Sequence, residues 1–420
     1  MVMKDRYSIS EVADMLSVSK ETLRRWDRSG KLIASREPMS NYRYYKNEQL
    51  TQFEEIGFLF NQENRNIEEP NREFTVIELF AGAGGLALGL EKAGLKCKVL
   101  NEIDHWASET LRMNRPEWNV IEDDIKNLSF KKYLNEIDII TGGFPCQAFS
   151  YAGKKLGLKD ARGTLFYEFA RIVDEVKPLI CIGENVRGLL RHDNGRTIEG
   201  MISVLNEVGY RVLPPKLLKA MFYRVPQKRE RVLIVGIRKD ISMDLYNFPK
   251  PYNKIFTLKD ALKNGELFDT DVPDSPGSKY PSNKKEVLDH VPPGGYWRDL
   301  PEKMQREYMG RSYFLGGGKT GMARRLSWEE PSLTLTCSPA QKQTERCHPD
   351  ETRPLSVREY ARIQTFPDDW EFSGSIAQQY KQIGNAVPVN LALEIGYSIV
   401  NFLNNYYREK IQNINFSDIS

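Results

Sequence analysis

The feature that most constrains the fold is an alternation of short apolar segments with amphipathic stretches that begins at Phe74. The apolar segments have the length of buried strands, and the stretch 165–176 has the apolar spacing of a helix. Strands and helices that alternate in this way predict an α/β fold, a doubly wound parallel sheet with helices on both faces. The strand-like segments are FTVIELF (74–80), KCKVLN (96–101), IDIITG (137–142), PLICIGE (178–184) and RVLIVGI (231–237).

The 420 residues are too many for one average domain. Five parts are expected: a small helical module (1–60), a polar linker (61–73), the sheet-forming part (74–237), a loop-rich part (238–343) with Pro, Gly and aromatic residues, and a C-terminal segment (344–420), whose return to the sheet-forming part is implied by the resemblance described below.

Composition excludes several classes of protein. We find no signal peptide and no stretch that we expect to cross a bilayer, so a cytoplasmic protein without a membrane partner is expected. The five cysteines form no CxxC pair, which suggests neither zinc nor structural disulfides, and no metal is expected. The net charge of +3 is uninformative, but basic residues outnumber acidic ones in 20–46 and 216–254, as in phosphate-contacting segments.

A glycine-rich turn follows the first strand-like segment, in ELFAGAGGLALGL (78–90). At the carboxyl end of a strand, such a turn lets a ligand approach the backbone and the following helix N-terminus. Glu102 ends the second segment, where an acid can hold ribose hydroxyls. With no GK[ST] run, the pattern favours a nucleoside-bearing cofactor over a phosphate cradle.

Cys146 stands in GGFPCQAFS (142–150), on a loop at the same edge of the sheet. A buried structural cysteine is the usual alternative, and we prefer it for Cys181; the loop position of Cys146 favours a nucleophile. A thiolate needs a cationic neighbourhood, which QKRER (227–231) can supply, because alternate residues of an extended segment share a face. A solvated edge is the alternative for that segment.

Glu184, in ENV (184–186), ends another strand-like segment at this edge. A desolvated acid there could be protonated and donate to a ring nitrogen, or it could merely cap the following segment.

Seven motifs follow one another along the chain: ELFAGAGG (78–85), NEID (101–104), DDI (123–125), GGFPCQAFS (142–150), ENV (184–186), QKRER (227–231) and QIGNAVP (382–388). In order and spacing they resemble the motifs of DNA (cytosine-5)-methyltransferases, from Phe74 to Leu403 apart from the middle of the chain. The sequence departs from the family pattern at Glu78, where Asp is common, at Asp123, where Gly is common, and in MFYRVPQ (221–227).

The resemblance implies that Cys146 adds to C6 of cytosine, that Glu184 and Arg231 contact N3 and the carbonyl oxygen of the base, and that Arg229 belongs to the catalytic set. It implies S-adenosylmethionine as methyl donor and a sheet of the S-adenosylmethionine-dependent methyltransferase type. The implied cofactor contacts are Phe80, Ala81, Gly82, Gly84, Glu102, Ile103, Asp124, Ile125, Pro145, Leu165 and Asn385.

The implied partner is duplex DNA. A stacked cytosine is out of reach, so the base must flip into the pocket. Gln147 and Ser150 are expected DNA contacts, 150–163 a lid that closes on phosphates, and the 238–343 part a target-recognition domain in which GGGKTGMARR (316–325) reads base edges. A restriction-modification role, with a cognate endonuclease that forms no stable complex, is what the resemblance suggests.

The N-terminal module shows a helix-turn-helix pattern. Ser8 and Glu11 predict a capping box, and Ser19 begins a second helix that ends at Gly30. With NYRYY (41–45), the module resembles the winged helix-turn-helix of MerR-type regulators, and a small helical packing module is the alternative. Operator binding that limits expression is expected, with methylation independent of the module; the expected DNA contacts are Lys20, Thr22, Arg24 and Arg25, and the expected core residues Leu23 and Trp26.

Three other functions are partly compatible with these features. An amino-methylating DNA enzyme is disfavoured because the chain has no [DNS]PP[YF] run. A tRNA cytosine-5 methyltransferase of the same fold fits less well with the long middle part and a DNA-type module. A non-catalytic DNA-binding regulator is opposed by the intact Cys146, Glu184 and Arg231.

Overall fold

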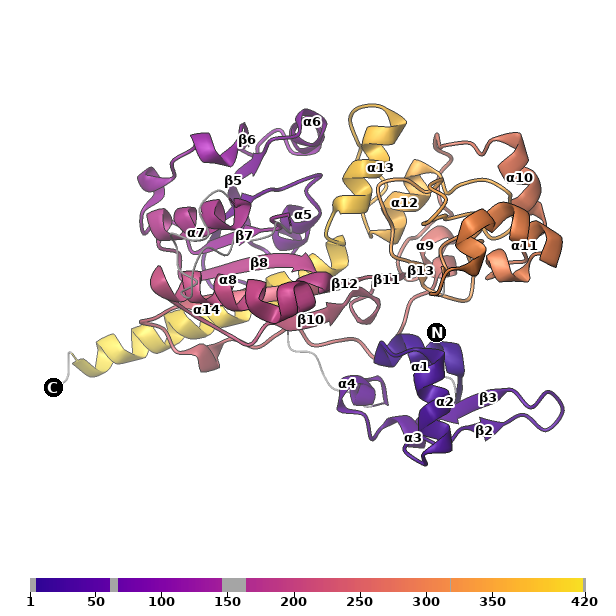
Figure 1. Ribbon diagram of the computed structural model, residues 1–420. Coiled ribbons are helices and arrows are strands. Elements are labelled where there is room, and N and C mark those ends of the chain that lie inside the picture. The colour runs from indigo at the N-terminus through magenta and orange to yellow at the C-terminus, as the bar shows by residue number, and fades with distance from the viewer. Residues whose placement is uncertain (1–4, 61–66, 146–163, 318, 418–420) are drawn as a thin grey trace.

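An eight-stranded mixed sheet forms the centre of the protein, in a computed structural model that describes residues 5–60, 67–145, 164–317 and 319–417 (Figure 1). The strand order is β10-β12-β8-β7-β4-β5-β6, and β9 pairs with β12. All five strand-like segments of the sequence form strands. The strands are β4 (Thr75–Leu79), β5 (Lys96–Glu102), β6 (Val120–Glu122), β7 (Ile139–Gly142), β8 (Ile180–Val186), β9 (Tyr210–Val212), β10 (Lys216–Lys219) and β12 (Glu230–Arg238).

Helices cover both faces of this sheet, which confirms the predicted fold class. Adjacent residues of one strand enter different cores: Val76 packs with α5 (Gly85–Lys92) and α14 (Val389–Ser417), whereas Ile77 packs with α7 (Leu165–Val176) and α8 (Arg196–Glu207). This alternation follows from the two-residue period of a strand.

One strand runs against the expected direction. Strands β6, β5, β4, β7 and β8 are parallel, but β12 is antiparallel to β8 and to β10. The cause is the short connection from β10 to β12, which reverses the chain and inserts β12 between β10 and β8. The reversal brings the start of β12, with Arg231 opposite Val186, to the carboxyl edge of β8. A parallel strand would have placed Arg231 at the far edge.

The C-terminal helix α14 packs along α5. A Cβ atom on Gly89 would lie 2.3 Å from the Cβ of Ala392, so the two helices touch through their backbones. The stretch Ile376–Gln412 is long and apolar enough to span a membrane, contrary to the sequence-based expectation, but 78% of its most apolar window is buried inside the protein. The stretch comprises α13 (Ile376–Asn385) and most of α14, and its burial identifies it as part of the protein core.

A second lobe follows β12 and contains short helices and long connections (Figure 1). Part of it has its own apolar core, in which Leu288, Trp297 and Met309 are buried. Its elements are α9 (Leu258–Leu262), α10 (Ser282–Asp289), α11 (Glu302–Met309), β13 (Ser332–Leu333), α12 (Val357–Ile363) and α13 (Ile376–Asn385); β13 pairs with β11 (Gln227–Lys228).

The N-terminal module is a helix-turn-helix with a three-stranded sheet. The predicted capping box is present, since Ser8 Oγ accepts from the Glu11 backbone and Glu11 accepts from the Ser8 backbone. Leu23 is fully buried, as expected, whereas Trp26 is half-buried and stacks on Phe53 at 5.7 Å. The elements are β1 (Arg6–Ser8), α1 (Ile9–Leu16), α2 (Lys20–Arg28), β2 (Ser35–Arg36), β3 (Arg43–Lys46), α3 (Asn47–Leu50) and α4 (Glu54–Gly57).

Candidate active site

A cavity of about 910 Å³ opens at the carboxyl edge of the parallel strands. Residues from β4, β5 and β8, from the segment that follows β7, from the start of β12 and from the end of α13 line it, so segments far apart in the sequence meet there. The predicted site residues that line it are Phe80, Ala81, Gly82, Glu102, Ile103, Asp124, Ile125, Pro145, Leu165, Glu184, Arg229, Arg231 and Asn385.

Gly84 is a predicted cofactor contact that the structure does not place on the cavity wall. A Cβ atom there would meet Leu111 at 2.7 Å and Trp370 at 3.1 Å, and the φ of Gly84 is +83°. Gly84 therefore allows the turn to form and to pack against the neighbouring side chains. Its expected direct contact with a cofactor has no support in this geometry.

The glycine-rich turn is held by Glu102 at the end of β5. One carboxylate oxygen accepts from the Gly82 backbone at 2.7 Å, and the other accepts from the Ile103 and Asp104 backbones at 2.9 and 2.8 Å. Burial raises the pKa of Glu102 although these bonds oppose the shift. The sequence expectation that Glu102 belongs to a ligand site at this edge fits its position.

Glu78 is a buried acid that sequence reasoning noted only as a departure from the family pattern. It is 2% exposed, lines the cavity, and its Oε2 has no hydrogen-bond partner among the described residues. Burial, and then the charge of Glu102, raise its pKa well above the ordinary value of 4.5. Such a shift favours the neutral carboxyl, which can donate a hydrogen bond.

Asp124 and Ile125, which the resemblance assigns to the cofactor, line the same cavity. Asp124 caps the short helix Ile125–Asn127 by accepting from the Lys126 backbone at 3.0 Å. Ile125 is buried, whereas Ile103, which also lines the cavity, is 65% exposed. An apolar side chain left exposed at a cavity mouth is free to cover a planar ligand.

Glu184 and Arg231 form a buried ion pair across the neighbouring strands β8 and β12. Glu184 Oε1 lies 2.5 Å from Arg231 Nε, and both side chains are 11% exposed. Burial lowers the pKa of Arg231, and the Glu184 carboxylate counteracts this shift. The pair gives the cavity one donor and one acceptor side by side.

Arg229 is anchored to the backbone rather than free in the cavity. It is 2% exposed and donates to the carbonyl oxygens of Leu335, Gly384 and Asn385 at 3.3, 3.0 and 3.5 Å. Burial, and then the charge of Arg231, lower its pKa to about 9. These bonds give it a role in holding the second lobe against the sheet.

Two side chains that sequence reasoning did not single out complete the site. Asn185 Nδ2 donates to the Phe144 carbonyl at 2.8 Å and so fixes the chain two residues before Cys146. Cys337 is exposed in the cavity wall and its Sγ donates to Asn385 Oδ1 at 3.3 Å. Asn185 stands inside the ENV motif, which was the available signal; Cys337 had none.

Three predicted residues, Cys146, Gln147 and Ser150, lie outside the described residues, as does the whole of the expected lid 150–163. Pro145, the last described residue before them, is at the cavity wall. The chain therefore leads to Cys146 from the same edge that carries Glu184 and Arg231.

The prediction that the loop 316–325 reads base edges is wrong for Arg325. This residue is 4% exposed and donates to the carbonyl oxygens of Leu288, Val291 and His348, and to Thr352 Oγ1. These bonds join several segments inside the second lobe. Arg325 cannot reach DNA from there.

In the module, Lys20, Arg24 and Arg25 are exposed on α2, as a DNA contact requires. Arg24 is paired with Glu21 at 3.2 Å. Thr22 is half-buried and its backbone donates to the N-cap Ser19.

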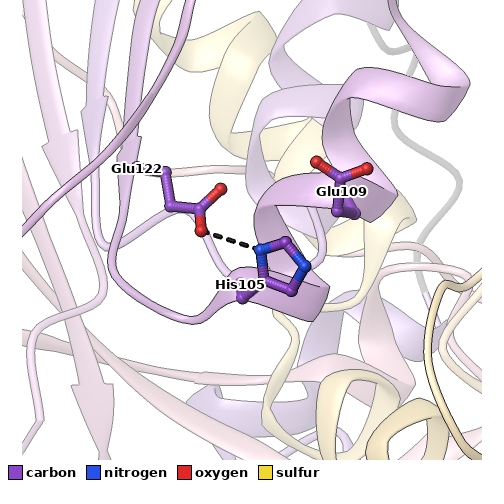
Figure 2. A group of neighbouring side chains, drawn as sticks. All are labelled: His105, Glu109 and Glu122. Carbon is purple, nitrogen blue, oxygen red and sulfur yellow. Dashed lines mark hydrogen bonds and ion pairs between the residues drawn. The ribbon is translucent and has the colours of Figure 1, made fainter.

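His105, Glu109 and Glu122 form the one cluster of the described residues whose ligand atoms lie within 4.8 Å (Figure 2). Arg112 already pairs with Glu109 at 2.8 Å and with Glu122 at 2.7 Å. Two ion pairs to one guanidinium satisfy the carboxylates, so the cluster is a surface network.

Comparisons agree with this geometry. A family model for C-5 cytosine-specific DNA methylases matches residues 74–401, and one for MerR family regulatory proteins matches 8–45. The Type II methyltransferase M.Eco47II of Escherichia coli is 63% identical over 404 residues, which are 96% of this chain and 97% of that protein. M.Sau96I of Staphylococcus aureus, also a Type II methyltransferase, is 55% identical over 340 residues, 80% of this chain and 78% of that protein.

Among solved structures, a DNA modification methyltransferase encoded in an E. coli prophage aligns with a TM-score of 0.55 and 26% identity, over 79% of this chain and 100% of that chain. The Dnmt2 methyltransferase of S. pombe, at 17% identity and a TM-score of 0.53 over 80% of this chain and 99% of that one, shares the fold. The chain belongs to the C-5 cytosine-specific DNA methylase family, with a MerR-type helix-turn-helix module at its N-terminus.

Proposed function

We propose that this DNA methylase transfers the methyl group of S-adenosylmethionine to C5 of a cytosine flipped out of a specific duplex sequence. The observation that carries the proposal is the Glu184–Arg231 pair, 2.5 Å apart, in the same cavity as the glycine-rich turn. One end of the cavity then suits a pyrimidine and the other a nucleoside-bearing methyl donor.

The cytosine is recognised along its N3 and carbonyl edge, which presents two neighbouring acceptors. A protonated Glu184 donates to N3 and Arg231 donates to the carbonyl oxygen, so the base replaces the contact that these side chains make with each other. The base reaches them only by leaving the helical stack, at a cost of a few kcal/mol, roughly.

Cys146 adds to C6 as a thiolate, and the electron pair of the C5–C6 double bond moves toward C5 while N3 is protonated by Glu184. When bound, the donor would supply a methyl group to C5 from its sulfonium sulfur and would leave as the thioether. Loss of the C5 proton to a base then expels the Cys146 thiolate, and return of the N3 proton to Glu184 restores the neutral ring. Asn185 supports these steps by holding the Phe144 carbonyl.

The residues present fit S-adenosylmethionine. The glycine-rich turn leaves room for backbone approach, and the unpartnered oxygen of buried Glu78 offers a hydrogen bond inside the cavity. Glu102 can take ribose hydroxyls with the lone pairs that its backbone bonds leave open, and Ile103 and Ile125 can cover the adenine.

A covalent trap tests the chemistry. In a duplex with 5-fluorocytosine at the target position, the fluorine cannot leave as a proton does, so elimination stalls after methyl transfer. We expect a protein–DNA band that survives denaturation with the wild type and none with Cys146→Ser. Wild-type protein that methylates ordinary duplex but gives no band would contradict addition by Cys146.

The biological setting is proposed from the relatives, which are Type II methyltransferases. We assign the chain to a cytoplasmic restriction-modification system with a cognate endonuclease that forms no stable complex with it. We keep the five-part division, with 74–237 as catalytic and cofactor-binding domain and 238–343 as target-recognition domain. The alternative function is tRNA cytosine-5 methylation. Methyl transfer to tRNA and not to duplex DNA would support it.

We further propose that the module binds an operator at the promoter of its own gene. Exposed Lys20 and Arg25 on α2 support this, with Thr22 and Arg24 beside them. Arg25→Ala should weaken binding of a promoter fragment by about tenfold in a gel-shift titration. Unchanged promoter affinity would exclude Arg25, and no shift by the wild type would exclude operator binding.

A further inference from the structure

The N-terminal module packs against the segment that carries the two cavity arginines. Asp14 Oδ2 at the end of α1 lies 2.7 Å from Lys228 Nζ, and Ser17 Oγ donates to Glu230 Oε1 at 2.6 Å. Figure 1 shows α1 next to the body of the protein and the β2–β3 hairpin directed away from it. These contacts join residues more than 200 positions apart in the sequence.

The partners of the module alternate with the arginines of the cavity. Arg229 and Arg231 line the cavity, whereas Lys228 and Glu230 hold the module. In extended chain, neighbouring side chains point to opposite sides. The module therefore contacts the outer side of the same four residues whose inner side faces the cavity.

Both contacts belong to larger networks. Lys228 also pairs with Glu330 of the second lobe at 2.8 Å, and Glu230 also accepts from Arg187, which follows β8, at 2.7 Å. Burial acts to lower the pKa of Lys228, but the Glu330 and Asp14 carboxylates outweigh it and raise that pKa. Lys228 is thus a charged group, 15% exposed, that needs both partners.

Apolar contacts fix the module in the same place. Phe58 and Phe222 meet edge to face with ring centroids 5.0 Å apart, and Met15 and Met221 share one buried core. Ser17 has a left-handed backbone, with φ of +54°, at the end of α1. Its hydroxyl is aimed at Glu230 by this turn, so the contact is built into the helix end.

We infer that Asp14 and Ser17 are positioning residues for methyl transfer, which act through Lys228 and Glu230 on the segment that presents Arg231 to the base. The inference rests on the proposed role of Arg231. It replaces the expectation that methylation is independent of the module. Misplacement of a reacting group by about 1 Å can cost about 100-fold in rate. Loss of the contacts that hold Lys228 and Glu230 should therefore cause a measurable fall in the rate of methyl transfer.

The test is a double variant, Asp14→Ala with Ser17→Ala, in the full chain. The rate of single-turnover methyl transfer to duplex DNA should fall roughly tenfold, while the dissociation constant of S-adenosylmethionine stays within about twofold, because its proposed binding residues lie outside the 228–231 segment. A matched control, Glu48→Ala with Thr51→Ala, also removes an acid and a hydroxyl from the module, but exposed ones without a body contact.

Rescue separates positioning from general stability. Ser17→Asn keeps a donor and tolerates the left-handed backbone, so it should transfer methyl groups faster than Ser17→Ala. If the double variant does not fold, as judged by circular dichroism, the rate of single-turnover methyl transfer by Ser17→Ala tests the inference instead. A wild-type rate in the double variant or in Ser17→Ala overturns the inference, as does a loss of S-adenosylmethionine binding that parallels the loss of rate.

The Arg231→Ala variant distinguishes a failure of the proposed function from a failure of this inference. If Arg231→Ala methylates at the wild-type rate, the role of Arg231 is wrong and the inference falls with it. If Arg231→Ala is inactive and the Asp14 and Ser17 variants are fully active, only the inference is wrong.

Discussion

At the scale of single residues, the site depends on charges whose state is set by burial. Arg231 is kept beside Glu184, Arg229 is tied to three carbonyl oxygens, and Glu78 has an unpartnered oxygen. Each has a different consequence when replaced. Removal of one partner of a buried pair leaves the other charge uncompensated, so single replacements in this pair are severe.

Arg231→Ala should lower the rate of methyl transfer by about 100-fold or more, because it removes the donor to the carbonyl oxygen when that oxygen gains charge. Single-turnover incorporation of labelled methyl groups measures this. Arg196→Ala, an exposed arginine on α8, is the control and should be neutral. An active Arg231→Ala protein would remove this arginine from the mechanism.

Glu78 predicts a pH dependence of stability. Its folded-state pKa is raised, so the contribution of its proton is complete below the unfolded value of 4.5 and is lost as the pH rises toward the folded pKa. The free energy of unfolding should therefore fall as the pH rises above the unfolded value of 4.5, more steeply in the wild type than in Glu78→Gln. Urea titrations across this range measure both slopes, and equal slopes would contradict a raised pKa.

Much of the site could be predicted at this scale, because motif residues stand at strand ends that a parallel sheet gathers at one edge. The anchoring bonds of Arg229 could not, since its acceptors Leu335 and Gly384 are more than 100 positions away. The position of Gly84 in the motif predicts a cofactor contact. A glycine has no side chain, so the sequence does not show whether it lines the cavity or packs against Leu111 and Trp370.

At the scale of elements, apolar patterning predicted five strands of the eight-stranded sheet, β4, β5, β7, β8 and β12, and the range of α7, whose bounds are as expected. The direction of β12 could not be read from its apolar run, because a buried strand has the same pattern in either direction. Only the hairpin-like link to β10 reverses it. That reversal is what places Arg231 beside Glu184.

The contact between α5 and α14 depends on glycine. Gly89→Ala should destabilise the protein by about 1–3 kcal/mol, because the new methyl group would overlap Ala392 in a packed core. Thermal melting measures the loss, and Gly188→Ala is a control with nothing closer to its Cβ than 3.9 Å. An unchanged melting temperature for Gly89→Ala would show that the helices can separate without cost.

At the scale of the whole molecule, the C-terminal helix closes the fold and the N-terminal module supports it. The end of α13 brings Asn385 to the cavity that β4 and β5 begin, so the site exists only when the distant ends of the family domain meet. The sequence indicated this return through QIGNAVP. It did not indicate that α1 contacts Lys228, since no pattern in either segment predicts a partner.

The measurement that tests the central claim most directly is bisulfite sequencing of host DNA after expression of the wild type and of Cys146→Ser. We expect cytosines protected from conversion at one recurring sequence with the wild type, and no protection with Cys146→Ser, because a hydroxyl is a far poorer nucleophile at neutral pH. Wild-type DNA that converts completely, or equal protection with Cys146→Ser, would contradict the account.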